Sequence, residues 1–569
     1  MSTISFLFGA GAEIELSMPS GEEFSLEIFR RLCIEGPDKV VIKSYLASQL
    51  ENRTFDENYK RWLLGDATGP RRISMFGSQS IKTLTKSSLK FRKALLKEAF
   101  VHLDQIADSQ LNVLVSNCQS IPTTKTGFRL GSFDFKGASA QIINLGRGTG
   151  KTYSSKLKKL IKSNGIFSEK LGNSILDSDM FCRLFLLYGK TANINATNEY
   201  EFQARKELGD ILHMLIQLYC GVRAEDLAET LNNSQVSINN AEIAGSGITP
   251  NEIDISLFDL GDIFSIDYDE VGAKAFSHIC ESTRPDPAEI TGIHGYAAAL
   301  AYRILEKVIA QGIDYRLLID DYWNYLYRPT AEWGKFTKIA TFLWGVWYYI
   351  TSHNLDSGAP SYYRDMAQCD QLVNRIVSVA TTNYRTFINQ ELPDQIFLGR
   401  TKNITHLNGT VTEFYDPYLN EVITVNSDGR GTADSTDVEG LIAPDSHHHV
   451  LVPLFFTQNG VKPITNIKKI QSYQKLYESW IQSSELVIVG YSFSDSDAHI
   501  NGMLRLLFHE PHHPLLIVVD KADEINKPDY RKRLATQLRL RVQDVEQIKL
   551  VSVETAPCRH DSSWLKGVI

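Results

Sequence analysis

The sequence predicts an α/β protein in which a Rossmann-like parallel sheet is interrupted by a large, mainly α-helical insertion. Three apolar runs, at residues 5–8, 376–380 and 486–489, each end in small polar residues. Strands of an open parallel sheet end in this way where they border a ligand crevice. Residues 33–370 instead show mostly helical spacing of their apolar side chains. We therefore expect residues 1–32 and 371–569 to build one sheet domain, and residues 33–370 to form a second, inserted domain.

The first apolar run leads into a glycine turn, Gly9-Ala10-Gly11. Glycine lacks Cβ, so the main chain at Gly9 and Gly11 is expected to adopt left-handed dihedrals and to approach a ligand closely. Its amides would then be free to face an anion such as pyrophosphate. A tight turn without a ligand explains the same pattern, because a full dinucleotide fingerprint also requires a third glycine at the start of a helix.

Helical segments follow this turn. Phe24, Ile28 and Leu32 share one face of a helix that is expected to begin at Gly21. Further periodic segments lie at residues 39–51, 88–106, 153–163, 198–220, 287–312 and 331–353. The longest apolar run, residues 339–350, is shorter than the roughly twenty residues that cross a bilayer, so it predicts a buried helix.

Strands and helices alternate again from about residue 371. Polar motifs that follow apolar or strand-like runs here are Thr381-Thr382-Asn383-Tyr384, Thr405-His406-Leu407-Asn408-Gly409 and Gly490-Tyr491-Ser492. Another apolar run, residues 515–519, ends at Asp520. A carboxylate at the tip of a strand suits the two hydroxyls of an adenosine ribose, and a helix cap explains Asp520 equally well.

These motifs, in this order, resemble the sirtuin family. Within it they are most similar to the bacterial defence-associated sirtuin-like NAD hydrolases, which share the glycine turn, a Thr-x-Asn-Tyr motif, a His-x-Asn-Gly motif and a Gly-Tyr-Ser motif. The matching stretches fall within residues 1–25 and 375–525. The resemblance implies a sirtuin-like fold that binds NAD as its substrate and needs no metal.

The resemblance also implies a catalytic pair, Asn383 and His406. A carboxamide at Asn383 would hold the ribose or the attacking water by hydrogen bonds. A neutral imidazole at His406 would accept a proton from a ribose hydroxyl or from water, because its pKa lies close to neutral pH.

Binding roles follow from the same resemblance. The pyrophosphate is expected to lie against Gly9, Ala10 and Gly11, while Gly490 and Ser492 meet the phosphates or the adenosine ribose. The other residues expected to bind NAD are Ser17, Pro19, Thr381, Tyr491 and Asp520.

Two residues depart from the family pattern. Glu13 stands where relatives often have serine, and Arg385 stands where they have an acid near the nicotinamide amide. A guanidinium beside the cationic ring would oppose binding unless it points away or pairs with Glu13. One hypothesis is that the two departures form a single compensated change.

Composition limits the remaining possibilities. The net charge of −8 and the pI of about 6.0 argue against a polycationic nucleic-acid surface, so any nucleic-acid contact would be local. The seven cysteines include no Cys-x-x-Cys pair, which argues against a disulfide framework and a structural zinc site. Protein-deacetylating sirtuins usually carry a zinc ribbon between the His and Gly-Ser motifs, where this chain has a polar tract at residues 411–446. No basic leader precedes the first strand, and we expect a cytoplasmic protein without membrane contact.

Several other patterns invite interpretation. The Gly-Lys-Thr motif at residues 146–152 is one residue short of a phosphate-binding loop. The histidines at 447–449 lack further ligands at metal-site spacing. Basic runs at residues 82–97 and 147–162 and an acidic run at 252–270 are either solvated faces or surfaces for a second subunit or an anionic partner.

We therefore expect an NAD glycohydrolase that releases nicotinamide and ADP-ribose in bacterial antiphage defence. Unrestrained NAD hydrolysis would starve the cell, so the enzyme is expected to wait for a trigger, with the insertion contacting further copies of the chain or a co-encoded defence protein. The alternative is a catalytically silent subunit that binds NAD or ADP-ribose and regulates a defence complex. Deacetylation is a weaker option, because the zinc ribbon is missing.

Overall fold

The computed structural model describes residues 2–19, 21–33, 37–51, 78–119, 134–145, 175–189, 199–223, 270–286, 289–327, 333–356, 358–428, 431–443, 450–456, 466–553 and 563–569. Main-chain contacts divide the chain into two compact units. Residues 1–75 and 316–569 form the first, which we call the sheet unit. Residues 76–315 form the second, which we call the helical unit.

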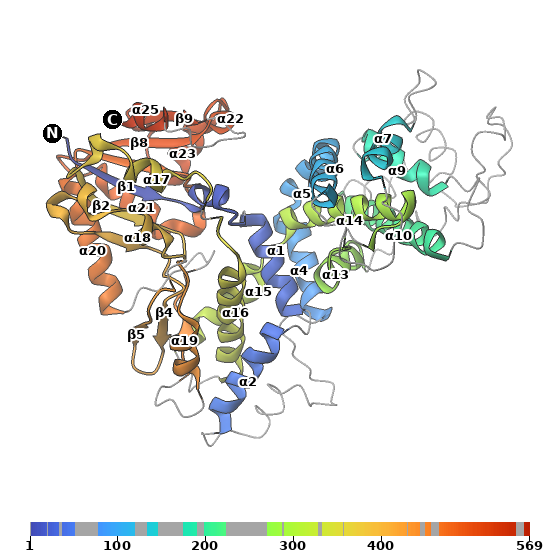
Figure 1. Cartoon of the computed structure of the whole chain (residues 1–569), viewed down its shortest axis with the longest axis horizontal. Helices are drawn as coiled ribbons and strands as arrows, with labels where there is room; N and C mark the ends of the chain where they lie inside the picture. The colour runs from blue at the N-terminus through green and yellow to red at the C-terminus, as the bar shows by residue number, and fades with distance from the viewer. Residues whose placement is uncertain are drawn as a thin grey trace. The chain divides into compact units, whose positions relative to one another are not determined.

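A six-stranded parallel sheet is the centre of the sheet unit (Figure 1). Its strands are β1 (Ile4–Phe8), β2 (Ile376–Thr381), β3 (Ile404–His406), β7 (Glu485–Val489), β8 (Leu515–Lys521) and β9 (Lys549–Val553). They lie in the order β3-β2-β1-β7-β8-β9, and every neighbouring pair is parallel. Counted along the chain this order is 3-2-1-4-5-6, which is typical of doubly wound nucleotide-binding folds. The predicted α/β class and parallel sheet are confirmed.

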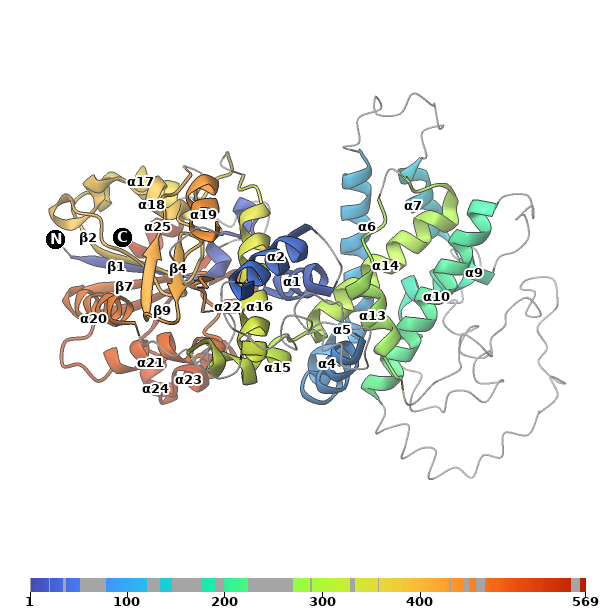
Figure 2. The same ribbon diagram turned by 90° about the horizontal axis from the view of Figure 1, so that it is seen from below.

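Helices cover both faces of this sheet (Figure 2). One face packs against α17 (Tyr362–Ala367), α18 (Phe387–Glu391) and α25 (Ser563–Val568), and the other against α20 (Ile467–Gln482), α21 (Ala498–Leu507) and α23 (Tyr530–Leu538). Successive residues of β1 alternate between the two cores: Phe6 and Phe8 enter the first, and Leu7 enters the second. Burial on both faces explains why the strands read as unbroken apolar runs. The short helices α22 (Ala522–Ile525) and α24 (Val542–Val545) complete this region.

A small antiparallel sheet takes two of its three strands from residues 411–446, the polar tract in which no strand was predicted. Its strands are β4 (Glu413–Asp416), β5 (Glu421–Thr424) and β6 (Val452–Pro453), and α19 (Ser435–Ile442) lies between β5 and β6 in the sequence. The Phe414 ring of β4 lies 5.6 Å from Trp344 and 6.2 Å from Trp347, both in α16 (Trp333–Ser352). These contacts with a distant helix help to bury Phe414, and no local sequence pattern reveals them.

The helices α1 (Gly21–Cys33), α2 (Pro37–Glu51), α15 (Arg316–Ile319) and α16 also belong to the sheet unit. The predicted helix start at Gly21 agrees with α1. The unit boundaries at 75/76 and 315/316 differ from the predicted 32/33 and 370/371. Specific contacts explain the difference, because the Tyr45 ring of α2 packs on Trp344 and its hydroxyl accepts a hydrogen bond from the Leu451 amide.

The described part of the helical unit consists of α4 (Ser78–Phe91), α5 (Lys93–Val101), α6 (Leu103–Gln119), α7 (Phe135–Asn144), α9 (Asp179–Gly189), α10 (Glu199–Val222), α13 (Ala273–Glu281) and α14 (Gly292–Gly312). The helix expected over residues 88–106 is broken at Arg92 and His102. None of the helices in the described residues combines the length and the apolar character that a membrane crossing requires.

Charged residues of the predicted basic run have partners inside the helical unit. Arg92 donates hydrogen bonds to the carbonyls of Gln311 and Ile313 and lies 3.4 Å from the Asp314 carboxylate. Lys82 pairs with Glu270, the last residue of the acidic run, at 2.8 Å. Arg92 is therefore part of the helical packing and is a poor probe of a docking surface. The predicted helix at 153–163 and the second basic run lie outside the described residues.

Candidate functional site

A cavity of about 560 Å³ lies at the carboxyl ends of the sheet strands. Such a volume suits a small molecule or a nucleotide. Its walls include residues that follow β1, β2, β3 and β7, together with the ends of β8 and β9. β1 and β7 lie side by side in the middle of the sheet, where the strand order changes direction. This switch point is where doubly wound sheets bind their ligands.

The structure places eight of the twelve predicted site residues in the cavity wall. These are Ala10, Gly11, Pro19, Asn383, Gly490, Tyr491, Ser492 and Asp520. The other four, Gly9, Ser17, Thr381 and His406, do not line it. Ser17 is exposed. Thr381 is buried, and its hydroxyl accepts a hydrogen bond from the main-chain N–H of Asn383 at 3.0 Å, which holds that residue in place.

The glycine turn differs from its predicted conformation. Gly9 is extended, with φ −90° and ψ 179°, and Gly11 has no positive φ either. The amides of both residues are also occupied, because Gly9 donates to the Val489 carbonyl and Gly11 to the Gly490 carbonyl, each at 2.9 Å. The prediction of left-handed glycines with amides free for an anion is wrong at these two positions. The glycines are needed because the loops after β1 and β7 touch main chain to main chain.

We expect Gly9→Ala to destabilise the sheet unit by about 2 kcal/mol. A Cβ at this position would lie 2.4 Å from both the Gly490 oxygen and the Tyr491 Cα, which are main-chain atoms at the end of a central strand. The matched control is Gly502→Ala in α21, where a Cβ meets nothing within 4 Å. In a helix interior, alanine is more stabilising than glycine by about 0.5–1 kcal/mol. Gly502→Ala should therefore raise the free energy of unfolding. Urea unfolding measures both changes, and a neutral Gly9→Ala would contradict the close approach.

Asn383 lies in the cavity wall and is 7% exposed. Its side-chain amide donates to the Gly9 carbonyl at 3.2 Å and to the Tyr363 hydroxyl at 3.3 Å. The carboxamide is therefore held between the loop after β1 and helix α17. It is oriented before any ligand arrives.

Glu13 is one of the acids that line this cavity, with Asp497, Asp520 and Glu524. Its side chain is 2% exposed and accepts a hydrogen bond from the Tyr363 hydroxyl at 2.8 Å. Burial raises the pKa of Glu13 to about 7, while Tyr363, the positive charge of Arg385 and the amide of Asn383 act in the opposite direction. Burial and the neighbouring carboxylate raise the pKa of the Tyr363 hydroxyl well above its ordinary value, so it is a hydrogen-bond donor at neutral pH.

Arg385 does not line the cavity. It is 1% exposed and donates to the carbonyls of Ile350 and His353 at the carboxyl end of α16, where a cation is favourable. Among the described residues it forms no direct ion pair with Glu13, although its charge still lowers the pKa of that carboxyl. Arg385 and Glu13 therefore attract each other only at longer range, and they do not form the direct pair that the hypothesis described.

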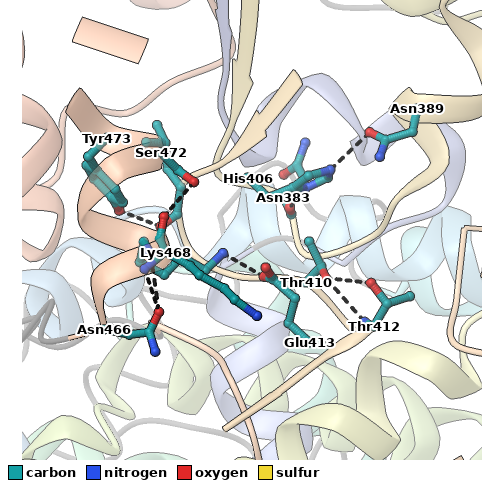
Figure 3. A network of polar contacts seen from close by, with 12 residues as sticks. Asn383, Asn389, His406, Thr410, Thr412, Glu413, Asn466, Lys468, Ser472 and Tyr473 are labelled. Atoms are coloured by element: carbon teal, nitrogen blue, oxygen red, sulfur yellow. Dashed lines mark hydrogen bonds and ion pairs between the residues drawn. The ribbon is translucent and has the colours of Figure 1, made fainter. Parts of the chain in front are cut away.

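His406 contacts Asn383 through the main chain (Figure 3). Nδ1 lies 3.2 Å from the Asn383 carbonyl oxygen, and Nε2 lies 3.1 Å from the side-chain amide of Asn389. Burial is the main reason why the pKa of His406 falls to about 4, so the ring is neutral at pH 7. The Asn389 atom that faces Nε2 is Oδ1, so both neighbours of the ring are oxygen acceptors. A neutral ring has one N–H; when Nδ1 donates it to the Asn383 carbonyl, Nε2 accepts a hydrogen bond from Asn389 only if that carboxamide is turned to present its nitrogen. Both ring nitrogens thus have a polar neighbour.

Asp520 has two partners of its own. One carboxylate oxygen accepts from the Lys521 amide at 2.8 Å, and the other accepts from the Tyr530 hydroxyl at 3.0 Å. The helix that follows, α22, has Lys521 as its N-cap residue without a side-chain cap. The alternative of a helix cap at Asp520 is therefore wrong, and the carboxylate lies in the cavity wall.

Several polar residues of the cavity carry no clear signal in the sequence. Glu13 was noticed only as a departure from a family pattern, and Tyr363, which orients it, gave no signal at all. Lys521 and Arg533 also line the cavity beside Asp520. The basic run at residues 531–533 is a signal that points to this part of the wall.

Among the described residues, no group of three or more His, Cys, Asp or Glu side chains is arranged to hold a metal ion. The histidines at 447–449 and the loop at 146–152 lie outside those residues. Comparison of the chain with protein-family models, curated proteins and solved structures found no match.

Proposed function

We propose that this protein is a sirtuin-like NAD glycohydrolase that cleaves NAD to nicotinamide and ADP-ribose. One observation carries the proposal. A cavity at the switch point of a 3-2-1-4-5-6 parallel sheet gathers Gly11, Asn383, Ser492 and Asp520 from four distant parts of the chain. Gly11, Asn383 and Ser492 belong to the motifs on which the resemblance to sirtuin-like NAD hydrolases rests. Asp520 is the acid at the tip of a strand that is proposed to bind the adenosine ribose.

The reaction breaks the bond between ribose C1′ and the nicotinamide nitrogen. Nicotinamide leaves as a neutral base, and water attacks the oxocarbenium-like sugar. Asn383 would hold the ribose or the water by hydrogen bonds, and Asp520 would accept hydrogen bonds from the adenosine ribose. His406, with Asn383 the second member of the proposed catalytic pair, must exchange Asn389 for substrate before Nε2 can accept a proton.

We further propose that residues 76–315 are an insertion that controls this activity in the cytoplasm during bacterial antiphage defence. Control would pass through a homo-oligomer or a co-encoded partner. The helical unit lies in the sequence between the two parts of the sheet unit. A movement of its ends is therefore transmitted by the chain to the segments that carry the two halves of the site.

A silent NAD-binding or ADP-ribose-binding subunit is the second candidate. The engagement of both His406 nitrogens, and the absence of this residue from the cavity wall, favour it. In a binding subunit His406 would serve only to hold the main chain of Asn383.

Incubation of the purified protein with NAD tests the proposal. We expect nicotinamide and ADP-ribose to appear in equal amounts, and we expect cells that express the protein to lose NAD when phage infection supplies the trigger. Calorimetry with NAD is the parallel measurement. Binding without nicotinamide release, in the purified protein and in infected cells, would support the silent subunit instead.

A further inference from the structure

Glu13 lines the cavity together with Asn383. It follows Gly11 in the loop after β1, between the short 3-10 turns η1 (Ala10–Ala12) and η2 (Ile14–Leu16). Asn383 follows β2, the strand that pairs with β1. Both side chains line the same cavity and both are almost fully buried.

A short hydrogen-bonded chain links the two side chains. The Asn383 amide donates to the Tyr363 hydroxyl at 3.3 Å, and that hydroxyl donates to a Glu13 carboxylate oxygen at 2.8 Å. Glu13 is the final acceptor of this chain. The network therefore supports the ionised carboxylate and fixes its position relative to the carboxamide.

We propose that Glu13 is the general base that activates the water for attack on ribose C1′. This role rests on the proposed function and assigns to it a residue outside the Asn383 and His406 pair. The water oxygen forms a bond to C1′ and gives one proton to the Glu13 carboxylate. The electron pair of the C1′–N1 bond leaves with nicotinamide, and Glu13 later returns the proton to solvent.

The surroundings of Glu13 suit this task. A general base works best when its pKa lies near the working pH. Burial raises the pKa of Glu13 to about 7. The groups that face it are the Tyr363 hydroxyl from α17, the Asn383 amide, and the charge of Arg385. All three stabilise the carboxylate, so the residue ionises near neutral pH despite its burial.

The rate of nicotinamide release against pH is the first test. In the wild type we expect the rate to rise with pH, with a midpoint near 7. Glu13→Gln keeps the shape of the side chain and should lower the rate at neutral pH about a hundredfold and remove this midpoint. Tyr363→Phe removes a hydrogen-bond donor to the Glu13 carboxylate and so raises the pKa of Glu13. The midpoint of the pH profile of this variant should therefore move upward. An unchanged midpoint in Glu13→Gln would overturn the proposal.

Chemical rescue separates a base from a positioning group. Azide is already an anion, so it can attack C1′ as nicotinamide leaves without losing a proton. We expect azide to restore nicotinamide release by Glu13→Gln with formation of ADP-ribosyl azide, and to rescue Asn383→Ala much less. Calorimetry should show that Glu13→Gln still binds NAD.

The outcomes distinguish this inference from the function on which it rests. Wild-type turnover with no azide rescue of Glu13→Gln would overturn the role of Glu13 and leave NAD hydrolysis intact. Wild-type protein that releases no nicotinamide under any condition would overturn both.

Discussion

Asn383→Ala is expected to lower the rate of nicotinamide release about a hundredfold or more. Asn383 lies in the cavity wall, and two hydrogen bonds, to Gly9 and to Tyr363, fix its carboxamide. Alanine removes the group that would orient the ribose or the water at the moment of bond cleavage. The measurement is the initial rate of nicotinamide release under the condition that activates the wild type.

The control is Asn403→Ala. The Asn403 amide donates to the Val377 carbonyl at 3.1 Å, and the residue does not line the cavity. This variant should keep nearly full activity, which separates loss of a catalytic group from loss of an asparagine near β2. We expect His406→Ala to show the same large loss as Asn383→Ala. Wild-type rates in both variants would show that the site is assigned to the wrong residues.

The free energy of unfolding of the wild type is expected to fall by about 3 kcal/mol as pH rises, because of Glu13. Glu13→Gln should abolish this fall. Burial raises the pKa of folded Glu13 from 4.5 to about 7. Between these values the folded state keeps a proton that the unfolded chain has already released. Folding therefore becomes less favourable as pH rises from about 4.5, and the whole loss is present above about 7. Below pH 4.5 the carboxyl is neutral in both the folded and the unfolded state. There, Glu13→Gln and the wild type should differ little in the free energy of unfolding.

Tryptophan fluorescence during urea unfolding measures this effect. All seven tryptophans lie within residues 1–75 and 316–569, so their signal reports the sheet unit. The difference in unfolding free energy between Glu13→Gln and wild type should grow by about 2.5 kcal/mol from about pH 5 to about pH 8. Glu421→Gln, at an exposed position in β5, is the matched control and should show no such growth. An equal difference at both pH values would mean that Glu13 is not buried as described.

Local sequence patterns predicted the parts of the fold whose formation depends on local chemistry. Apolar runs that end in Thr381 or Gly490 became central strands, and helical spacing from Gly21 became α1. The α/β class followed from these patterns, because strands buried on both faces need unbroken apolar runs. The strands β4 and β5 escaped prediction, since the burial of Phe414 involves contacts with the distant helix α16.

The sequence by itself determined that Gly11, Asn383, Ser492 and Asp520 would lie at one edge of a sheet, because parallel strands bring their carboxyl ends together. Only the tertiary structure decided what lies between them. The packing of two main chains makes Gly9 extended, and enclosure by Tyr363 and neighbouring groups makes Glu13 a buried acid. Burial and close approach are properties of contacts between distant segments, so no reading of neighbouring residues reveals them.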